Sequence, residues 1–136
     1  MGATLYALPA LVTLLALAFY FGLILKIGMM RGKLNLAPSE ARGDAAFERL
    51  CRVQVNTAEQ LILFLPVLWL FAMFTSVNGA AALGVLWIVG RAIYTRGYVQ
   101  AFEKRKLGFV LTILASLILL VGAFIGVAQA LLSAGN

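Results

Sequence analysis

The sequence predicts an all-α integral membrane protein, a bundle of four transmembrane helices, from its composition, its uncharged runs and its charge distribution. Of the 136 residues, 63% are hydrophobic and 12% are charged, whereas soluble domains average about a half and about a quarter. The hydrophobic residues suffice for four spans of about 20 residues each. This composition excludes a soluble enzyme, a disordered chain and a nucleic-acid-binding domain, so no nucleic acid is expected as a partner.

Uncharged runs place the four spans in order along the chain. Residues 3–25 carry no charge, and the absence of a basic residue before them argues against a secretory signal peptide. The uncharged stretch 60–90 is too long for one span, and the turn signal Asn78-Gly79 divides it. The run 107–136 supplies the last span. The expected spans of this single domain, residues 1–136, are 4–28, 48–75, 80–99 and 107–132.

The basic residues predict the orientation of these spans. All eleven lie in or beside two connections, the one between spans one and two and the one between spans three and four. Because cytoplasmic loops of membrane proteins are rich in Lys and Arg, we expect both connections in the cytoplasm and both termini on the other side. In chain order the basic residues are Lys26, Arg31, Lys33, Arg42, Arg49, Arg52, Arg91, Arg96, Lys104, Arg105 and Lys106.

A polar face is expected at the cytoplasmic end of the second span. Residues 47–59 contain neither Gly nor Pro and continue directly into an apolar run. At about 100° per residue, Arg49, Arg52, Asn56 and Glu59 fall within an arc of roughly 80°. Glu59 lies deepest, where an unpaired carboxylate is costly. The alternative is an ion pair between Arg52 and Glu59 that only joins helices.

The third span carries a second polar face on the same side of the membrane. Arg91, Tyr94 and Tyr98 occupy an arc of roughly 60° on a helix. Taken alone, two interfacial tyrosines and a snorkelling arginine would explain this pattern. Two such faces together predict a cavity that opens to the cytoplasmic side, with excess positive charge and one buried acid.

The residue types of this cavity indicate its ligand. Arginines bind carboxylates or phosphates through paired hydrogen bonds, and a deep glutamate suits an amino group. A small zwitterion with more than one carboxylate meets both demands, and a second, apolar ligand could enter from the bilayer. One cysteine and no histidine give no basis for a structural metal site.

The same residues carry a resemblance to a known family. The sequence resembles the membrane-associated proteins in eicosanoid and glutathione metabolism, the MAPEG family, and within it the branch of microsomal glutathione transferase type two and leukotriene C synthase. The resemblance covers most of the chain. Its motifs are Phe47-Glu48-Arg49, Arg52-x-Gln54-x-Asn56-x-x-Glu59, Leu68-Trp69, Gly90-Arg91-x-x-Tyr94-x-x-Gly97-Tyr98, Lys104-Arg105 and Gly108-Phe109.

The resemblance implies a homotrimer that binds glutathione, as a co-substrate, between neighbouring four-helix subunits among membrane lipids. The implied enzyme is a glutathione transferase that conjugates glutathione to a lipophilic electrophile, or reduces a lipid hydroperoxide as a peroxidase, in detoxification. Arg105 would be catalytic and would face the glutathione sulfur. Short members with few loops are common in bacteria, which implies the bacterial inner membrane. The implied glutathione-binding residues are Arg31, Arg52, Gln54, Asn56, Glu59, Arg91, Tyr94 and Tyr98.

Two alternatives and one departure from the family remain. Gln60 stands where leukotriene C synthase has a tyrosine that helps to bind glutathione, so leukotriene synthesis is not expected. A non-catalytic lipid- or fatty-acid-binding member of the family would lack an arginine at position 105. A small multidrug transporter would need a carboxylate in the first span, and residues 3–25 hold none. Cys51 is not expected as a nucleophile, because no histidine activates it and it should lie off the face of Arg52 and Glu59.

Overall fold

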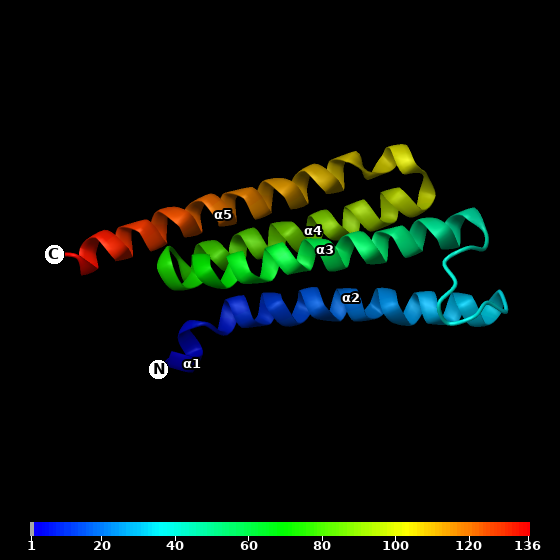
Figure 1. Ribbon diagram of the computed structural model, residues 1–136, viewed down its shortest axis with the longest axis horizontal. Coiled ribbons are helices and arrows are strands. Elements are labelled where there is room, and N and C mark those ends of the chain that lie inside the picture. The colour runs from blue at the N-terminus through cyan, green and yellow to red at the C-terminus, as the bar shows by residue number, and fades with distance from the viewer. Residues whose placement is uncertain (1) are drawn as a thin grey trace.

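The computed structural model describes residues 2–136, which form a bundle of long helices (Figure 1). Within these residues, four helices are long and apolar enough to cross a membrane, namely α2, α3, α4 and α5, the last continuous with η1. The prediction of an all-α, four-helix membrane bundle is therefore confirmed. The elements in chain order are α1 (Gly2–Leu5), α2 (Ala7–Lys33), α3 (Ala45–Phe74), α4 (Val77–Gln100), the 3-10 helix η1 (Phe102–Arg105) and α5 (Lys106–Ala134).

The first connection is shorter than the uncharged runs indicate, because both flanking helices extend into it. Helix α2 continues to Lys33, beyond the end expected at residue 28. Helix α3 begins before residue 48, where the carboxylate of Asp44 accepts a hydrogen bond of 2.7 Å from the backbone amide of Phe47. Such an N-cap satisfies one of the unpaired amides of a first helical turn. The cap fixes the first turn of α3, whose Phe47 shares a buried cluster with Ile27 of α2.

The turn between α3 and α4 lies slightly earlier than the Asn-Gly signal indicates. The Ser76 hydroxyl accepts a hydrogen bond of 2.9 Å from the backbone amide of Gly79 and caps α4. Asn78 and Gly79 are therefore part of the first turn of α4, and the chain reverses at Thr75 and Ser76. Serine is among the preferred N-cap residues, which explains why the cap takes precedence over the turn signal.

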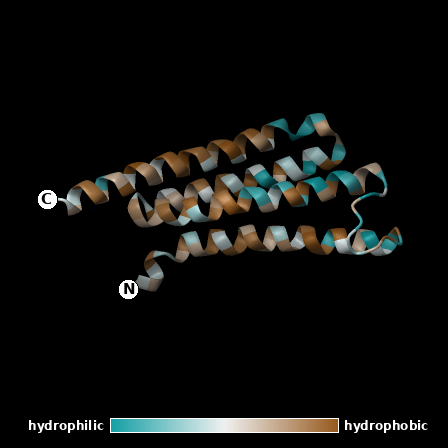
Figure 2. Cartoon of the chain, in the orientation of Figure 1, coloured by the Kyte–Doolittle hydropathy of each residue, from teal (hydrophilic) through white to brown (hydrophobic). Residues whose placement is uncertain are grey.

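The bundle has a polar end and an apolar outer surface. Both termini lie at one end, whereas the α2–α3 connection and η1 lie at the other (Figure 1). Hydrophilic residues gather at the end with these connections, and hydrophobic residues cover the length of the helices (Figure 2). Large apolar side chains are exposed on all four long helices, for example Leu14, Ile62, Val85 and Phe124. Such a surface suits the hydrocarbon core of a membrane, where exposed apolar side chains carry no free-energy cost.

Two buried clusters hold the helices together. The central one includes Phe64 of α3 and Trp87 of α4, whose rings stack with centroids 4.2 Å apart. The second lies toward the polar end and includes Phe47 together with Tyr94. A Cβ atom at Gly108 would collide with the backbone of Tyr94, so only glycine lets α5 pack this closely on α4. The candidate site lies beside this second cluster.

Candidate functional site

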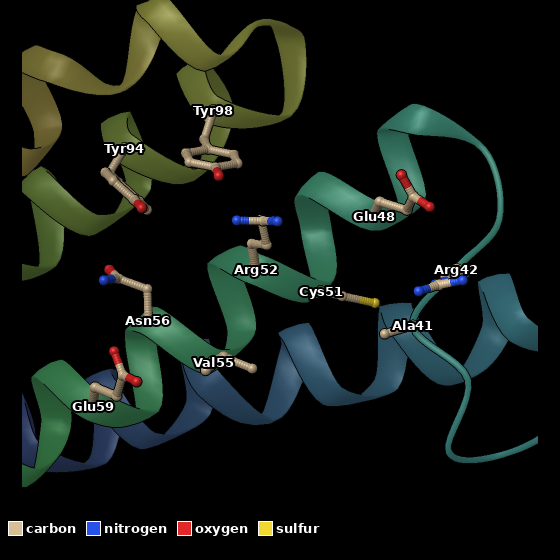
Figure 3. A pocket seen from close by; sticks show the side chains of 10 residues that line it. All are labelled: Ala41, Arg42, Glu48, Cys51, Arg52, Val55, Asn56, Glu59, Tyr94 and Tyr98. Carbon is tan, nitrogen blue, oxygen red and sulfur yellow. The ribbon is translucent and has the colours of Figure 1, made fainter.

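A cavity of about 600 Å³ opens at the polar end of the bundle. Its walls are the α2–α3 connection, the first half of α3 and the last turns of α4 (Figure 3). Its volume lies within the range of roughly 300–1,000 Å³ that small-molecule sites occupy. The lining residues are Ala41, Arg42, Glu48, Cys51, Arg52, Val55, Asn56, Glu59, Tyr94 and Tyr98.

Three residues of the predicted polar face of α3 line this cavity. Figure 3 shows Arg52, Asn56 and Glu59 on successive turns of the helix, with Asn56 between the guanidinium and the carboxylate. Arg49, which the periodicity places on the same face, lies outside the cavity wall, and its Nε donates a hydrogen bond of 3.0 Å to the carbonyl of Val99. Arg49 therefore ties α3 to the end of α4.

A second cavity of about 420 Å³ adjoins the first. The two share Asn56, Tyr94 and Tyr98 as lining residues. The remainder of the second wall comes from η1 and the start of α5 and combines apolar side chains with two cations. These residues are Phe102, Arg105, Lys106, Phe109 and Val110. A charged compartment and a more apolar one thus meet at one amide and two tyrosines.

Arg91 lies beneath this meeting point and lines neither cavity. Its side chain is 0% exposed. Nη1 donates to Oδ1 of Asn56 at 2.9 Å, and Nη2 donates to Oγ1 of Thr57 at 2.6 Å. The guanidinium carbon also lies 4.2 Å from the ring centroid of Tyr94. Because Oδ1 of Asn56 already accepts a hydrogen bond from Arg91, the amide nitrogen is the group of Asn56 best placed to bind a ligand in the cavities.

Two further residues implied by the resemblance lie outside both cavities of their own chain. Nε of Arg31 donates a hydrogen bond of 2.7 Å to the carbonyl of Glu40, and its guanidinium lies 5.7 Å from the ring centroid of Phe47. Gln54 is half-buried on α3, on a different face from Arg52 and Asn56. Of the expected residues, the cavities bring together Arg52, Asn56, Glu59, Tyr94, Tyr98 and Arg105.

Sequence reasoning missed part of the first cavity. Cys51 was expected off the polar face, but its buried thiol lies in the wall. Residues three and four apart share a helix face, so the series Glu48, Cys51, Arg52 and Val55 follows from the same periodicity. Arg42 reaches the cavity from the α2–α3 connection, and no helical periodicity applies to it. In the described residues 2–136, no three His, Cys, Asp or Glu side chains form a group that could hold a metal.

The comparisons with known proteins all indicate the same family. The model of the MAPEG family matches residues 7–125. An uncharacterized protein of Synechocystis sp. is 48% identical over 119 residues, which cover 88% of this chain and 87% of the relative. Microsomal glutathione S-transferase 2 of Mus musculus is 37% identical over 108 residues, covering 79% of this chain and 74% of the relative. Leukotriene C4 synthase of Bos taurus is 33% identical over 99 residues, covering 73% and 66%.

Proposed function

Since this chain belongs to the MAPEG family and is an integral, multi-pass membrane protein, we propose that it is a glutathione transferase of the membrane. The observation that carries the proposal is the pair of adjoining cavities. One has charges suited to a zwitterionic peptide, and the other has apolar walls and the guanidinium of Arg105. A transferase needs both, because a polar thiol and a lipophilic electrophile must meet at one point.

Glutathione would occupy the first cavity. It carries two carboxylates and one amino group. The cavity offers two guanidiniums for the carboxylates and two glutamates, Glu48 and Glu59, of which one suffices for the amino group. Arg42 and Arg52 would bind the carboxylates, and Glu59 would bind the amino group. The amide nitrogen of Asn56 would donate a hydrogen bond to a peptide carbonyl or carboxylate of glutathione. In this arrangement Arg91 positions Asn56 and does not itself touch the ligand.

Arg105 would activate the sulfur. A free thiol has a pKa of about 8.5, so only a small fraction is thiolate at neutral pH. A guanidinium beside the sulfur stabilises the charged form and lowers this pKa, and a shift of one to two units corresponds to about 1.4–2.7 kcal/mol. The thiol proton leaves to solvent, because arginine stays protonated and cannot accept it.

The thiolate would then react with a ligand held by the second cavity. With an electrophilic carbon, a carbon–sulfur bond forms and the leaving group departs with the electron pair. With a lipid hydroperoxide, the thiolate attacks the outer peroxide oxygen, the oxygen–oxygen bond breaks, and the alkoxide takes a proton from solvent and leaves as the alcohol. A second glutathione then converts the resulting sulfenic acid to glutathione disulfide and water. The apolar side chains of Phe109 and Val110 suit the hydrocarbon part of either substrate.

Assembly and location are part of the same proposal. The resemblance implies a homotrimer with sites between subunits. In such a trimer Arg31 and Gln54, which lie outside both cavities of their own chain, would contribute to a neighbouring subunit's site. The first cavity opens at the end of the bundle that holds the basic connections. We propose that this end faces the cytoplasm of a bacterium, across its inner membrane, where glutathione is kept reduced.

The test measures the ultraviolet absorbance of thiolate when glutathione is added to the protein purified in detergent. We expect a thiolate signal at neutral pH and turnover of an aryl halide such as 1-chloro-2,4-dinitrobenzene. The variant Glu59→Gln keeps the shape of the side chain but removes its charge, so it should weaken glutathione binding about tenfold. In size-exclusion chromatography the variant should elute at the same volume as the wild type, because its fold and assembly are unchanged.

Either of two results would contradict the proposal. Glutathione binding without thiolate formation or turnover would favour a binding-only member of the family. Unchanged binding in Glu59→Gln would show that the carboxylate only stabilises the fold, and the assignment of the first cavity to glutathione would fail.

A further inference from the structure

One residue holds the guanidinium of Arg105 at two points. The guanidinium carbon lies 3.4 Å from the centroid of the Phe102 ring, and Nη1 donates a hydrogen bond of 2.8 Å to the carbonyl of Phe102. A cation over the face of an aromatic ring is attracted by its π electrons. In a 3-10 helix the side chains at positions i and i+3 eclipse each other, so η1 brings these two residues onto one face.

The ring of Phe102 is itself supported from α4. It packs edge-on against Tyr98, with centroids 5.8 Å apart and an angle of 76° between the planes. The ring centroids of Tyr98 and Tyr94 lie 5.5 Å apart, and both tyrosines are buried. Three aromatic rings therefore form a row along the two cavities, and Arg105 lies at its end.

Backbone contacts hold η1 in place, but they do not determine where the guanidinium of Arg105 lies. That position depends on the contacts of the Arg105 side chain itself. A Cβ at Gly97 would collide with the carbonyl oxygen of Lys104, so the absence of a side chain there lets η1 pack onto α4. The amide of Lys104 also donates to the carbonyl of Ala101 at 3.0 Å. An arginine side chain has four rotatable bonds, however, and η1 presents a carboxylate, Glu103, that could attract it elsewhere.

We propose that Phe102 is a positioning residue, which keeps the Arg105 guanidinium at the second cavity and thereby sets how strongly it stabilises the glutathione thiolate. The inference rests on the glutathione transferase function proposed above. The interaction of two charges falls with their separation, so the pKa of the bound thiol depends on where the guanidinium stands. Phe102 is 52% exposed, so its replacement removes little from the buried core.

The experiment titrates the thiolate absorbance of bound glutathione against pH, without an electrophile, in the full-length protein. Phe102→Leu removes the ring but keeps the backbone carbonyl and apolar bulk, and Phe102→Met is a second variant without a ring. In both we expect the midpoint to rise by about half to one unit. For a wild-type thiol one to two units below about 8.5, this rise makes the thiolate fraction at neutral pH about 1.5- to 8-fold smaller. The dissociation constant of glutathione should change less than about twofold, because the first cavity is intact.

Two variants serve as controls. Phe102→Tyr keeps an aromatic face and should titrate like the wild type. Phe109→Leu changes the apolar wall of the same cavity but keeps the Phe102 ring and carbonyl that hold Arg105, so the midpoint of the glutathione titration should stay at the wild-type value. Because no electrophile is present, weaker binding of the electrophile in the second cavity cannot cause a shift of the titration midpoint.

The outcomes distinguish this inference from the function on which it rests. If Arg105→Ala raises the midpoint and both ring-free variants do not, the role of Phe102 is wrong and that of Arg105 stands. An equal shift in Phe102→Tyr or Phe109→Leu would also overturn it. If the wild type forms no thiolate, or Arg105→Ala leaves the midpoint unchanged, the proposed function itself fails.

Discussion

At the scale of single residues, the site separates cations that can touch a ligand from cations that act through other side chains. Arg52 and Arg105 line the cavities, whereas Arg91 is completely buried and donates to Asn56 and Thr57. A buried cation without compensating contacts is costly. Here two hydrogen bonds and the Tyr94 ring compensate it in part, while the buried Nε has no hydrogen-bond partner in the described residues. Arg91 is therefore part of the framework of the site.

Arg105 should be essential for turnover and not merely a topology charge. Arg105→Ala removes the cation proposed to stabilise the thiolate, so the pKa of the bound thiol should return toward about 8.5. Turnover at neutral pH should then fall about 8- to 25-fold, mainly in kcat, and higher pH should partly restore it. A pH–rate profile of both proteins measures this.

Lys104 provides the matched control for this prediction. It is a neighbouring cation of η1 that lines neither cavity, and its Nζ donates to the side chain of Gln100. Lys104→Ala should therefore keep the wild-type rate and pH profile. Lys106 is unsuitable, because it lines the second cavity. Equal losses in Arg105→Ala and Lys104→Ala would point to loop charge in general and refute the specific role.

Arg91 should affect glutathione binding only through Asn56. Arg91→Lys keeps the charge, but an ammonium cannot reproduce the planar fork that reaches both acceptors. Loss of an oriented amide donor should weaken binding about tenfold, measured as the dissociation constant of glutathione. In an Asn56→Ala background the same substitution should have almost no further effect, because its target is absent. Additive losses in this double-mutant cycle would instead indicate that Arg91 contacts the ligand directly.

At the scale of elements, hydropathy and periodicity predicted what depends on local sequence. The apolar runs identified the four spanning helices, and the spacing of Arg52, Asn56 and Glu59 identified a face of α3 that does line a cavity. These features are predictable because a helix repeats every 3.6 residues, whatever it packs against. Helix ends were less predictable, since caps such as Asp44 and Ser76 act over a single turn.

Features that depend on the packing of separate elements were not predictable. Periodicity places Arg91 beside Tyr94 and Tyr98, but only the approach of α3 to α4 buries it under Asn56. Likewise, the contact of Arg105 with Phe102 requires the 3-10 geometry of η1. No pattern of apolar residues in the sequence predicts this 3-10 helix. The sequence thus indicated several residues that line the cavities, but not the side-chain contacts that each one makes.

Across the complete bundle, the charged connections and the cavities share one end. The two basic connections lie at one end of the bundle, and both termini lie at the other (Figure 1). The cavities lie at the end with the connections, because their walls include Arg42 of the α2–α3 connection and Arg105 of η1. If the positive-inside rule holds, the cavities open to the cytoplasm and draw on its reduced glutathione. The chain contains a single cysteine, Cys51, so a Cys51→Ser background allows new cysteines to report which side they face.

The prediction for the intact chain is opposite labelling of its two ends. Ser39 in the α2–α3 connection and Ser133 near the end of α5 are both exposed, so replacing either with cysteine should leave the bundle intact. In whole cells, a membrane-impermeant thiol reagent should label Ser133→Cys, and it should label Ser39→Cys only after the membrane is opened. The reverse pattern would place both termini in the cytoplasm. The cavities would then face the oxidising side, where a reduced thiol substrate is scarce, and a role in using cytoplasmic glutathione would fail together with the topology.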